Sequence, residues 1–113
     1  MWKGGNLRKC LLCSVGLAAF LLLNAHAGRA DDAGQKLYSS KCAACHGPDG
    51  KGETTVGKAN KLRDLASADV QKQSDVELTT TITAGKAKMP AYGKSLKPDQ
   101  IKSLVDYIRT LKK

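Results

Sequence analysis

The sequence is poor in several residue types that mark particular classes of protein. Only four of its 113 residues are cysteine, which excludes the disulfide-dense small proteins, where cysteine exceeds roughly 8–10%. Aromatic residues make up 4% of the chain, and histidine and methionine occur twice each. The length excludes a multidomain enzyme, because one domain takes about 100–200 residues. Charged residues, 26% of the chain, are spread along it, which argues against a bundle of membrane-spanning helices.

The N-terminal segment has the pattern of a secretory signal peptide. Three basic residues precede thirteen uncharged, mostly apolar residues at 11–23, and small residues follow. We therefore predict a signal peptide at 1–30, cleaved after Ala27 or Ala30, and a folded domain at 31–113 of a periplasmic protein. An uncleaved membrane anchor is the alternative, although the apolar run is shorter than the roughly 20 residues that span a bilayer. Cleavage would remove four basic and no acidic residues, so that the net charge falls from +9 to +5.

The motif that carries chemistry is Cys42-Ala43-Ala44-Cys45-His46. C-x-x-C-H is the attachment signature of c-type haem. Cysteines three apart on a helix lie on one face, so both thiols can reach the two vinyl groups along one porphyrin edge. His46 follows directly and is placed to bind the iron. We therefore predict one covalent haem c, which also supplies the stabilisation that so short a mature chain needs.

Two other interpretations of C-x-x-C have to be weighed. The pair could form a disulfide or a thiol oxidoreductase site, but no strand of the thioredoxin-like pattern precedes Cys42. With the second pair, Cys10 and Cys13, it could bind zinc, but that pair lies within the predicted signal peptide. Haem attachment is favoured, and Cys10, Cys13 and His26 are assigned no chemistry.

The second axial ligand is predicted by elimination. Six-coordinate haem iron takes a second histidine, a methionine or, more rarely, a lysine. Beyond the predicted signal peptide His46 is the only histidine and Met89 the only methionine, so Met89 is predicted to ligate. A methionine in a loop between helices is often only a core residue. The iron would then be five-coordinate or bind Lys86, Lys88 or Lys94.

Together these features resemble the short, monohaem bacterial class I cytochromes c. The similarity covers nearly all of the mature sequence, with Gly34, Leu37 and Tyr38 before CAACHG, then KMPAYG and the closing LVDYIRTL. It implies an all-α fold of about three to four helices around one haem. It also implies that the last helix crosses the first near Gly34 and Tyr38.

The chain departs from that family in two places. Residues 53–66 lack the proline whose carbonyl accepts the axial histidine N–H in many relatives, so the orienting partner of His46 is unidentified. No tryptophan follows the predicted signal peptide to bind a haem propionate, and Lys61, Arg63 and Tyr92 are the candidates for that contact.

Caps and turn residues predict the helices. A first helix at 31–45 ends at the glycine-rich turn 47–52, and 53–66 is expected to be a loop with Leu62 and Leu65 as anchors against the haem.

Two further helices and a short one follow this loop. A short helix at 67–70 precedes one at 75–84, which the capping box Ser-Asp-Val-Glu at 74–77 and Gly85 delimit, against the strand propensity of its threonines. The last helix starts at Pro98 and has an apolar stripe at helical spacing, formed by Ile101, Leu104, Val105, Ile108 and Leu111.

The ligand set predicts a soluble one-electron carrier rather than an enzyme. Histidine and methionine are neutral and bind both iron oxidation states, and methionine raises the reduction potential. The alternative from another class is a haem peroxidase or gas-binding sensor in which Met89 is displaced from the iron; a purely structural haem is the third possibility.

The lysines near the predicted methionine ligand point to the partners. A basic rim would attract redox partner proteins that have acidic docking surfaces. The alternative is that these lysines only form a solvated surface, and their charge alone favours neither interpretation. We expect no nucleic acid, no stable membrane insertion and a monomer. The rim consists of Lys86, Lys88, Lys94 and Lys97.

Overall fold

The computed structural model describes residues 27–112. Its elements are six helices, three of which have 10 to 15 residues and three only four or five. In chain order they are α2 (Ala27–Lys41), α3 (Ala43–His46), α4 (Thr55–Ala59), α5 (Ala68–Gln71), α6 (Asp75–Ala84) and α7 (Pro98–Thr110). The all-α prediction is confirmed. Cys10, Cys13 and His26 of the predicted signal peptide lie outside the described residues.

The helix α6 begins and ends as predicted, and α7 begins at the predicted Pro98 but ends at Thr110, one residue before Leu111 of the predicted stripe. In α6 the Ser74 side chain accepts a hydrogen bond from the Glu77 backbone, and the Glu77 carboxylate accepts from Ser74 N at 2.7 Å, so the capping box is formed. Before α7, Lys97 provides no side-chain cap. The Gln100 side chain instead accepts from Lys97 N at 2.9 Å, which explains how this helix starts after a poor capping residue.

Two predictions about the first half of the chain are wrong. The first helix does not run from 31 to 45, because α2 begins at Ala27 and is interrupted at Cys42, whose φ of −117° is far from the helical value of about −63°. Residues 53–66 are not all loop, because they contain α4. The Thr54 side chain caps α4 by accepting from Gly57 N at 2.8 Å.

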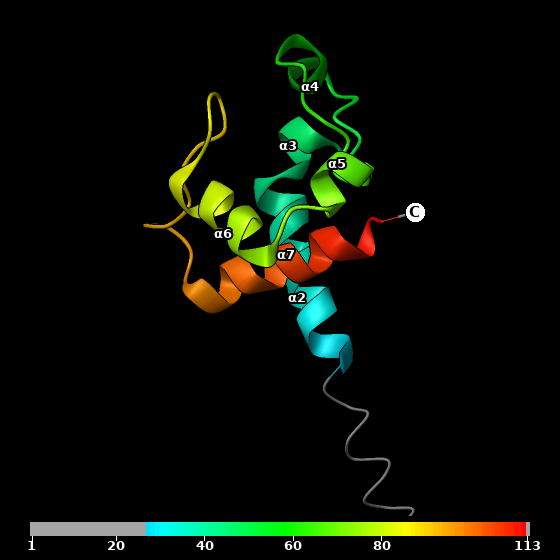
Figure 1. The fold of residues 1–113 in the computed structure, drawn as a ribbon. Coiled ribbons are helices and arrows are strands. Elements are labelled where there is room, and N and C mark those ends of the chain that lie inside the picture. The colour runs from blue at the N-terminus through cyan, green and yellow to red at the C-terminus, as the bar shows by residue number, and fades with distance from the viewer. Residues whose placement is uncertain (1–26, 113) are drawn as a thin grey trace, which may run out of the picture.

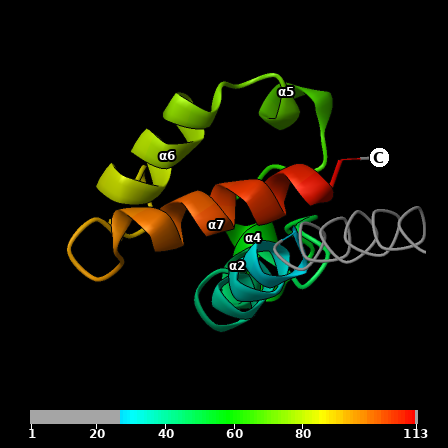
Figure 2. The ribbon, with the colours of Figure 1, turned by 90° about the horizontal axis from the view of Figure 1, so that it is seen from below.

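The crossing of α7 over α2 forms the centre of the fold (Figure 1). A Cβ atom at Gly34 would overlap the Ser103 carbonyl oxygen and lie 3.0 Å from Tyr107 Cβ, so only glycine allows this approach. The rings of Tyr38 and Tyr107 pack at the crossing with centroids 5.1 Å apart. Figure 2 shows that α7 runs between α2 on one side and α5 and α6 on the other.

The buried core is built mainly on α7. This helix buries four apolar side chains, whereas α6 buries only Leu78 and Ile82 over ten residues. The core residues are Tyr38, Val70, Leu78, Ile82, Leu96, Ile101, Leu104, Val105 and Ile108. Among residues 27–112, no helix has the length and apolar character needed to cross a membrane.

Candidate functional site

The C-x-x-C-H motif consists of Cys42, which separates α2 from α3, and of the single-turn helix α3 itself. Cys42 N donates to the Tyr38 carbonyl at 2.8 Å, and Cys45 N and His46 N both donate to the Cys42 carbonyl, at 3.1 and 2.9 Å. Cys42 is half-buried and Cys45 is exposed, and the two do not form a disulfide. Burial, together with the nearby Cys45 thiol, raises the pKa of Cys42 to about 11, so this thiol is protonated at neutral pH.

The end of the motif is held by contacts from three directions. The buried Tyr38 hydroxyl donates to the Gly47 carbonyl at 2.8 Å. Gly52 N donates to the His46 carbonyl at 2.7 Å, and the Thr54 hydroxyl donates to the Cys45 carbonyl at 2.6 Å. The backbone around His46 is therefore fixed both by Tyr38 before it and by the chain that follows it.

Close packing of α4 against α3 adds to this fixation. A Cβ atom at Gly57 would overlap the Gly52 carbonyl oxygen and lie 2.8 Å from the Cys45 carbonyl oxygen. Position 57 therefore requires glycine. Neither Gly57 nor Thr54 was predicted from the sequence, although a threonine directly before a turn of helix is a capping signal.

His46 has the properties of a metal ligand. It is half-buried, and burial lowers its pKa, which favours the neutral imidazole that binds metals. Its Nδ1 atom is buried and has no hydrogen-bond partner among the described residues. The orienting partner that the sequence left unidentified is thus not supplied by a hydrogen bond in this part of the chain.

Two cavities that share residues bring the predicted site residues together. The larger has a volume of 280 Å³ and the smaller 70 Å³. Cys42, His46 and Met89 line both, and Cys45 lines the smaller. The larger is otherwise walled mostly by apolar side chains, which are Tyr38, Leu62, Leu65, Val70, Leu78, Ile82, Ala87, Leu104 and Ile108.

We call residues 42–62 the histidine side of these cavities and residues 75–93 the methionine side. On the methionine side, Met89 closes a tight turn in which Met89 N donates to the Lys86 carbonyl at 2.9 Å and Lys86 N donates to the Met89 carbonyl at 3.2 Å. Ala87 within this turn has a φ of 52°. The turn positions the methionine against the core.

Cations surround the cavities, and no acidic side chain is among the described residues that line either of them. Within residues 27–112 none of these cations forms an ion pair. Lys94 and Lys97, two of the four lysines expected at this rim, line neither cavity. Lysines and arginine on the lining are Lys41, Lys61, Arg63, Lys86 and Lys88.

The three candidates for a propionate contact are separated by the structure. Lys61 and Arg63 line the larger cavity, whereas Tyr92 lines only the smaller. The Tyr92 hydroxyl donates to the Lys41 carbonyl at 2.9 Å, so its hydrogen is already used. Burial, followed by the Cys42 and Cys45 thiols, raises the pKa of Tyr92. Lys61 and Arg63 remain the candidates for the propionate contact.

The donor set fits a c-type haem. An apolar cavity suits a porphyrin, a neutral imidazole and a thioether are both ligands of haem iron, and the two thiols come from one helical turn. A small all-helical chain with C-x-x-C-H after its first long helix, and with a histidine and a methionine on the walls of one apolar cavity, defines the class of small c-type cytochromes.

Comparison with known proteins agrees with this class. The family described as cytochrome c oxidase, cbb3-type, subunit III matches residues 29–108. Cytochrome c6 of Gloeothece citriformis is 37% identical over 108 residues, which cover 88% of this chain and 92% of that protein. The solved structure of the KustC0563 c-type cytochrome has a TM-score of 0.66 and 36% identity, and covers 71% of this chain and 98% of its own.

The chain belongs to the cytochrome c family and is a small class I c-type cytochrome, a class of haem proteins that carry electrons. Membership implies haem c with iron as the cofactor and redox proteins as partners. The cbb3-type cytochrome c oxidase subunit FixP of Azorhizobium caulinodans is 37% identical over 79 residues, but the chain spans only 26% of that protein.

Proposed function

We propose that this protein is a one-electron carrier with one covalently attached haem c, held by Cys42 and Cys45 and ligated by His46 and Met89. The observation that carries the proposal is that the same apolar cavity has both the imidazole and the thioether on its lining. Haem iron supplies the reversible one-electron couple when it is bound.

The residues of the chain have separate roles in this proposal. His46 is kept neutral by burial and presents a nitrogen donor in both oxidation states. Met89 presents a soft sulfur donor, which favours the reduced metal and raises the potential. The apolar lining would exclude water, and with both His46 and Met89 bound to the iron no site would remain for peroxide or dioxygen. An enzymatic role is therefore disfavoured.

Absorption spectra of the purified protein in both redox states test this proposal. A carrier gives a low-spin ferric spectrum with the weak red band of iron–thioether ligation, and takes up cyanide or carbon monoxide slowly. A high-spin ferric spectrum with rapid ligand uptake would instead support the alternative, a haem peroxidase or gas sensor with Met89 displaced. A colourless, folded product of maturation in the exported compartment would contradict both.

The proposed location is the periplasm, after removal of a signal peptide at residues 1–30. Support comes from the basic start and apolar run of the N-terminal segment. The predicted cleavage sites after Ala27 and Ala30 fall at the first turn of α2, and the family match starts at residue 29. The mass of the mature protein distinguishes the two sites and would reveal an uncleaved N-terminus.

The proposed partners are redox proteins with acidic docking surfaces. The protein is proposed to bind them as a monomer. The cations on the cavity lining and the lack of acidic residues there support this electrostatic complement. The rate of electron transfer to an acidic partner protein should fall as ionic strength rises, because salt screens the attraction. A rate independent of ionic strength would contradict the steering role of these cations.

A further inference from the structure

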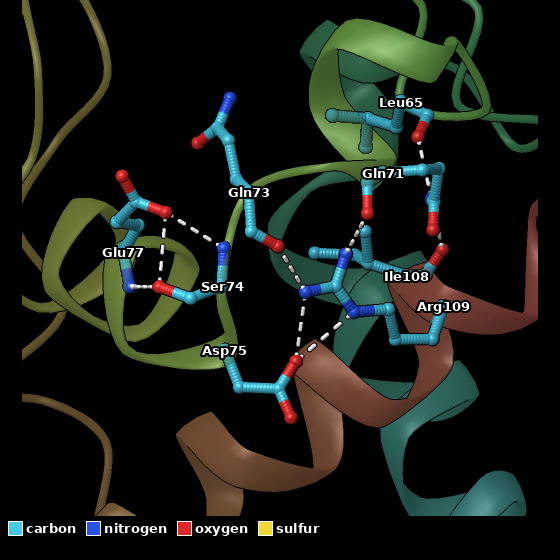
Figure 3. A network of polar contacts seen from close by, with 8 residues as sticks. All are labelled: Leu65, Gln71, Gln73, Ser74, Asp75, Glu77, Ile108 and Arg109. Atoms are coloured by element: carbon cyan, nitrogen blue, oxygen red, sulfur yellow. Dashed lines mark hydrogen bonds and ion pairs between the residues drawn. The ribbon is translucent and has the colours of Figure 1, made fainter.

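Arg109, in the last turn of α7, makes four hydrogen bonds to one connecting segment (Figure 3). Its Nε and Nη2 donate to the Asp75 carboxylate at 3.0 and 2.8 Å. Nη1 donates to the Gln71 carbonyl at 3.0 Å, and Nη2 donates to the Gln73 carbonyl at 2.5 Å. Only an arginine has the planar fork that reaches three acceptors in this way.

The Gln71 side chain adds a second connection between this segment and α7. Its amide nitrogen donates to the Leu65 carbonyl at 2.8 Å and to the Ile108 carbonyl at 2.9 Å. Residues 65–74 contain only the four-residue helix α5, so the hydrogen bonds of these side chains hold a segment that has little regular structure.

The segment that Arg109 holds leads directly to the methionine side. Asp75 is the first residue of α6, and the turn that contains Met89 follows the other end of that helix. Tyr92 N donates to the Ile82 carbonyl and Gly93 N to the Thr83 carbonyl, both at 3.0 Å. The chain directly after the Met89 turn is therefore hydrogen-bonded to the last turn of α6.

Apolar packing holds α6 less firmly than it holds α7. Only Leu78 and Ile82 are buried in α6, and Val76 is 74% exposed. The polar contacts of Arg109 at the N-terminal end of α6 are thus a large share of what keeps this helix in place against the rest of the fold.

We propose that Arg109 is a positioning residue for Met89. It fixes the start of α6, and the helix transmits that fixation to the turn that presents the methionine sulfur. The inference rests on the proposed ligation by Met89. If it is correct, loss of the Arg109 contacts weakens the competition of Met89 against external ligands, even under conditions where the protein remains fully folded.

Titration of the purified ferric holoprotein with imidazole tests the proposal, and Arg109→Lys is the first variant. Lysine keeps the positive charge but lacks the planar guanidinium group. We expect imidazole to bind about tenfold more tightly, which corresponds to the loss of one charge-assisted hydrogen bond. We also expect the iron–thioether band to weaken. Lys102→Met is the matched control, because it removes an exposed ion pair of the same helix and should change neither readout.

Asp75→Ala is the second variant, and it decides the question alone if Arg109→Lys does not accumulate. We expect about threefold tighter imidazole binding, since one of three acceptors is lost. Asp99→Ala removes the equivalent first-turn acid of α7 and is its control.

A purely structural role for Arg109 gives a different result. The thermal midpoint would then fall in Arg109→Lys and Asp75→Ala while the imidazole affinity and the band stayed at wild-type values, and this would overturn the proposal. Met89→Ala, measured in parallel, separates the two hypotheses. If it leaves the band and the imidazole affinity unchanged, the proposed ligation fails rather than the role of Arg109.

Discussion

The histidine side and the methionine side of the cavities are held in place in different ways. Around His46, backbone groups close in sequence bond to one another, and α4 packs so tightly on α3 that position 57 tolerates no side chain. Met89 instead lies on a turn carried by α6, which is fixed largely by two buried side chains and by Arg109, 34 residues after Asp75. One ligand is therefore positioned by local structure, and the other by long-range contacts.

The largest expected effect comes from adding one carbon atom on the histidine side. Gly57→Ala should lower the free energy of unfolding by about 3 kcal/mol or more, because the new Cβ overlaps two carbonyl groups that cannot move independently. Guanidinium unfolding of the haem-bound protein measures this. Ala59→Gly, at an exposed position of the same helix, is the control and should cost about 1 kcal/mol. Equal costs would mean that the packing of α4 on α3 is not tight.

Tyr38→Phe should have an intermediate effect, because it leaves the buried Gly47 carbonyl without its donor. We expect a loss of about 1–2 kcal/mol in the free energy of unfolding at neutral pH.

Ionisation of the Tyr38 hydroxyl should make the free energy of unfolding depend on pH. Burial raises the pKa of Tyr38 above its ordinary value of 10.0, so the unfolded chain loses this proton first as the pH rises. The contribution of Tyr38 is complete below pH 10 and is lost above it. Stability should therefore fall more steeply above pH 10 in the wild type than in Tyr38→Phe, and parallel curves would contradict the assignment.

At the start of the methionine side, Ser74→Ala removes the cap of α6 and should cost about 1 kcal/mol. Thr79→Ala, at an exposed position of the same helix, should not destabilise, because alanine has the higher helix propensity. Thermal unfolding of both variants checks the difference. A neutral Ser74→Ala would mean that tertiary contacts alone hold this end of the helix.

The smallest effect is expected from an exposed ion pair on the histidine side. Lys58 and Glu53 are 3.1 Å apart and about two-thirds exposed. Lys58→Met should change the free energy of unfolding by less than about 0.5 kcal/mol, because solvent screens such pairs. A loss above about 1 kcal/mol would show that side-chain ion pairs, and not the backbone contacts, hold α4.

The sequence predicted those helices whose ends are marked by capping or turn residues nearby in the chain. The capping box and Gly85 delimit α6, and Pro98 marks the start of α7. The interruption at Cys42 was not predicted. The helix α4 was not predicted either, although its Thr54 cap is local, because five residues are too few to show a helical period.

The site was predictable to a similar extent. The C-x-x-C-H motif and the scarcity of histidine and methionine predicted the four site residues, which all line the cavities. They are Cys42, Cys45, His46 and Met89. Arg109 was not predictable, since nothing near it in the sequence marks a partner 34 residues away. Among the lining cations, Lys61 and Arg63 were predicted as candidates for a propionate contact, whereas Lys41 was not, because only the fold brings it to the cavities.

Ligation by Met89 is most directly tested by comparing the ferric absorption spectrum and midpoint potential of Met89→Ala with those of the wild type. Loss of the thioether should abolish the weak red band, lower the potential and open the iron to external ligands, because the sulfur donor stabilises the reduced metal. A variant that keeps the wild-type band and potential would contradict the account.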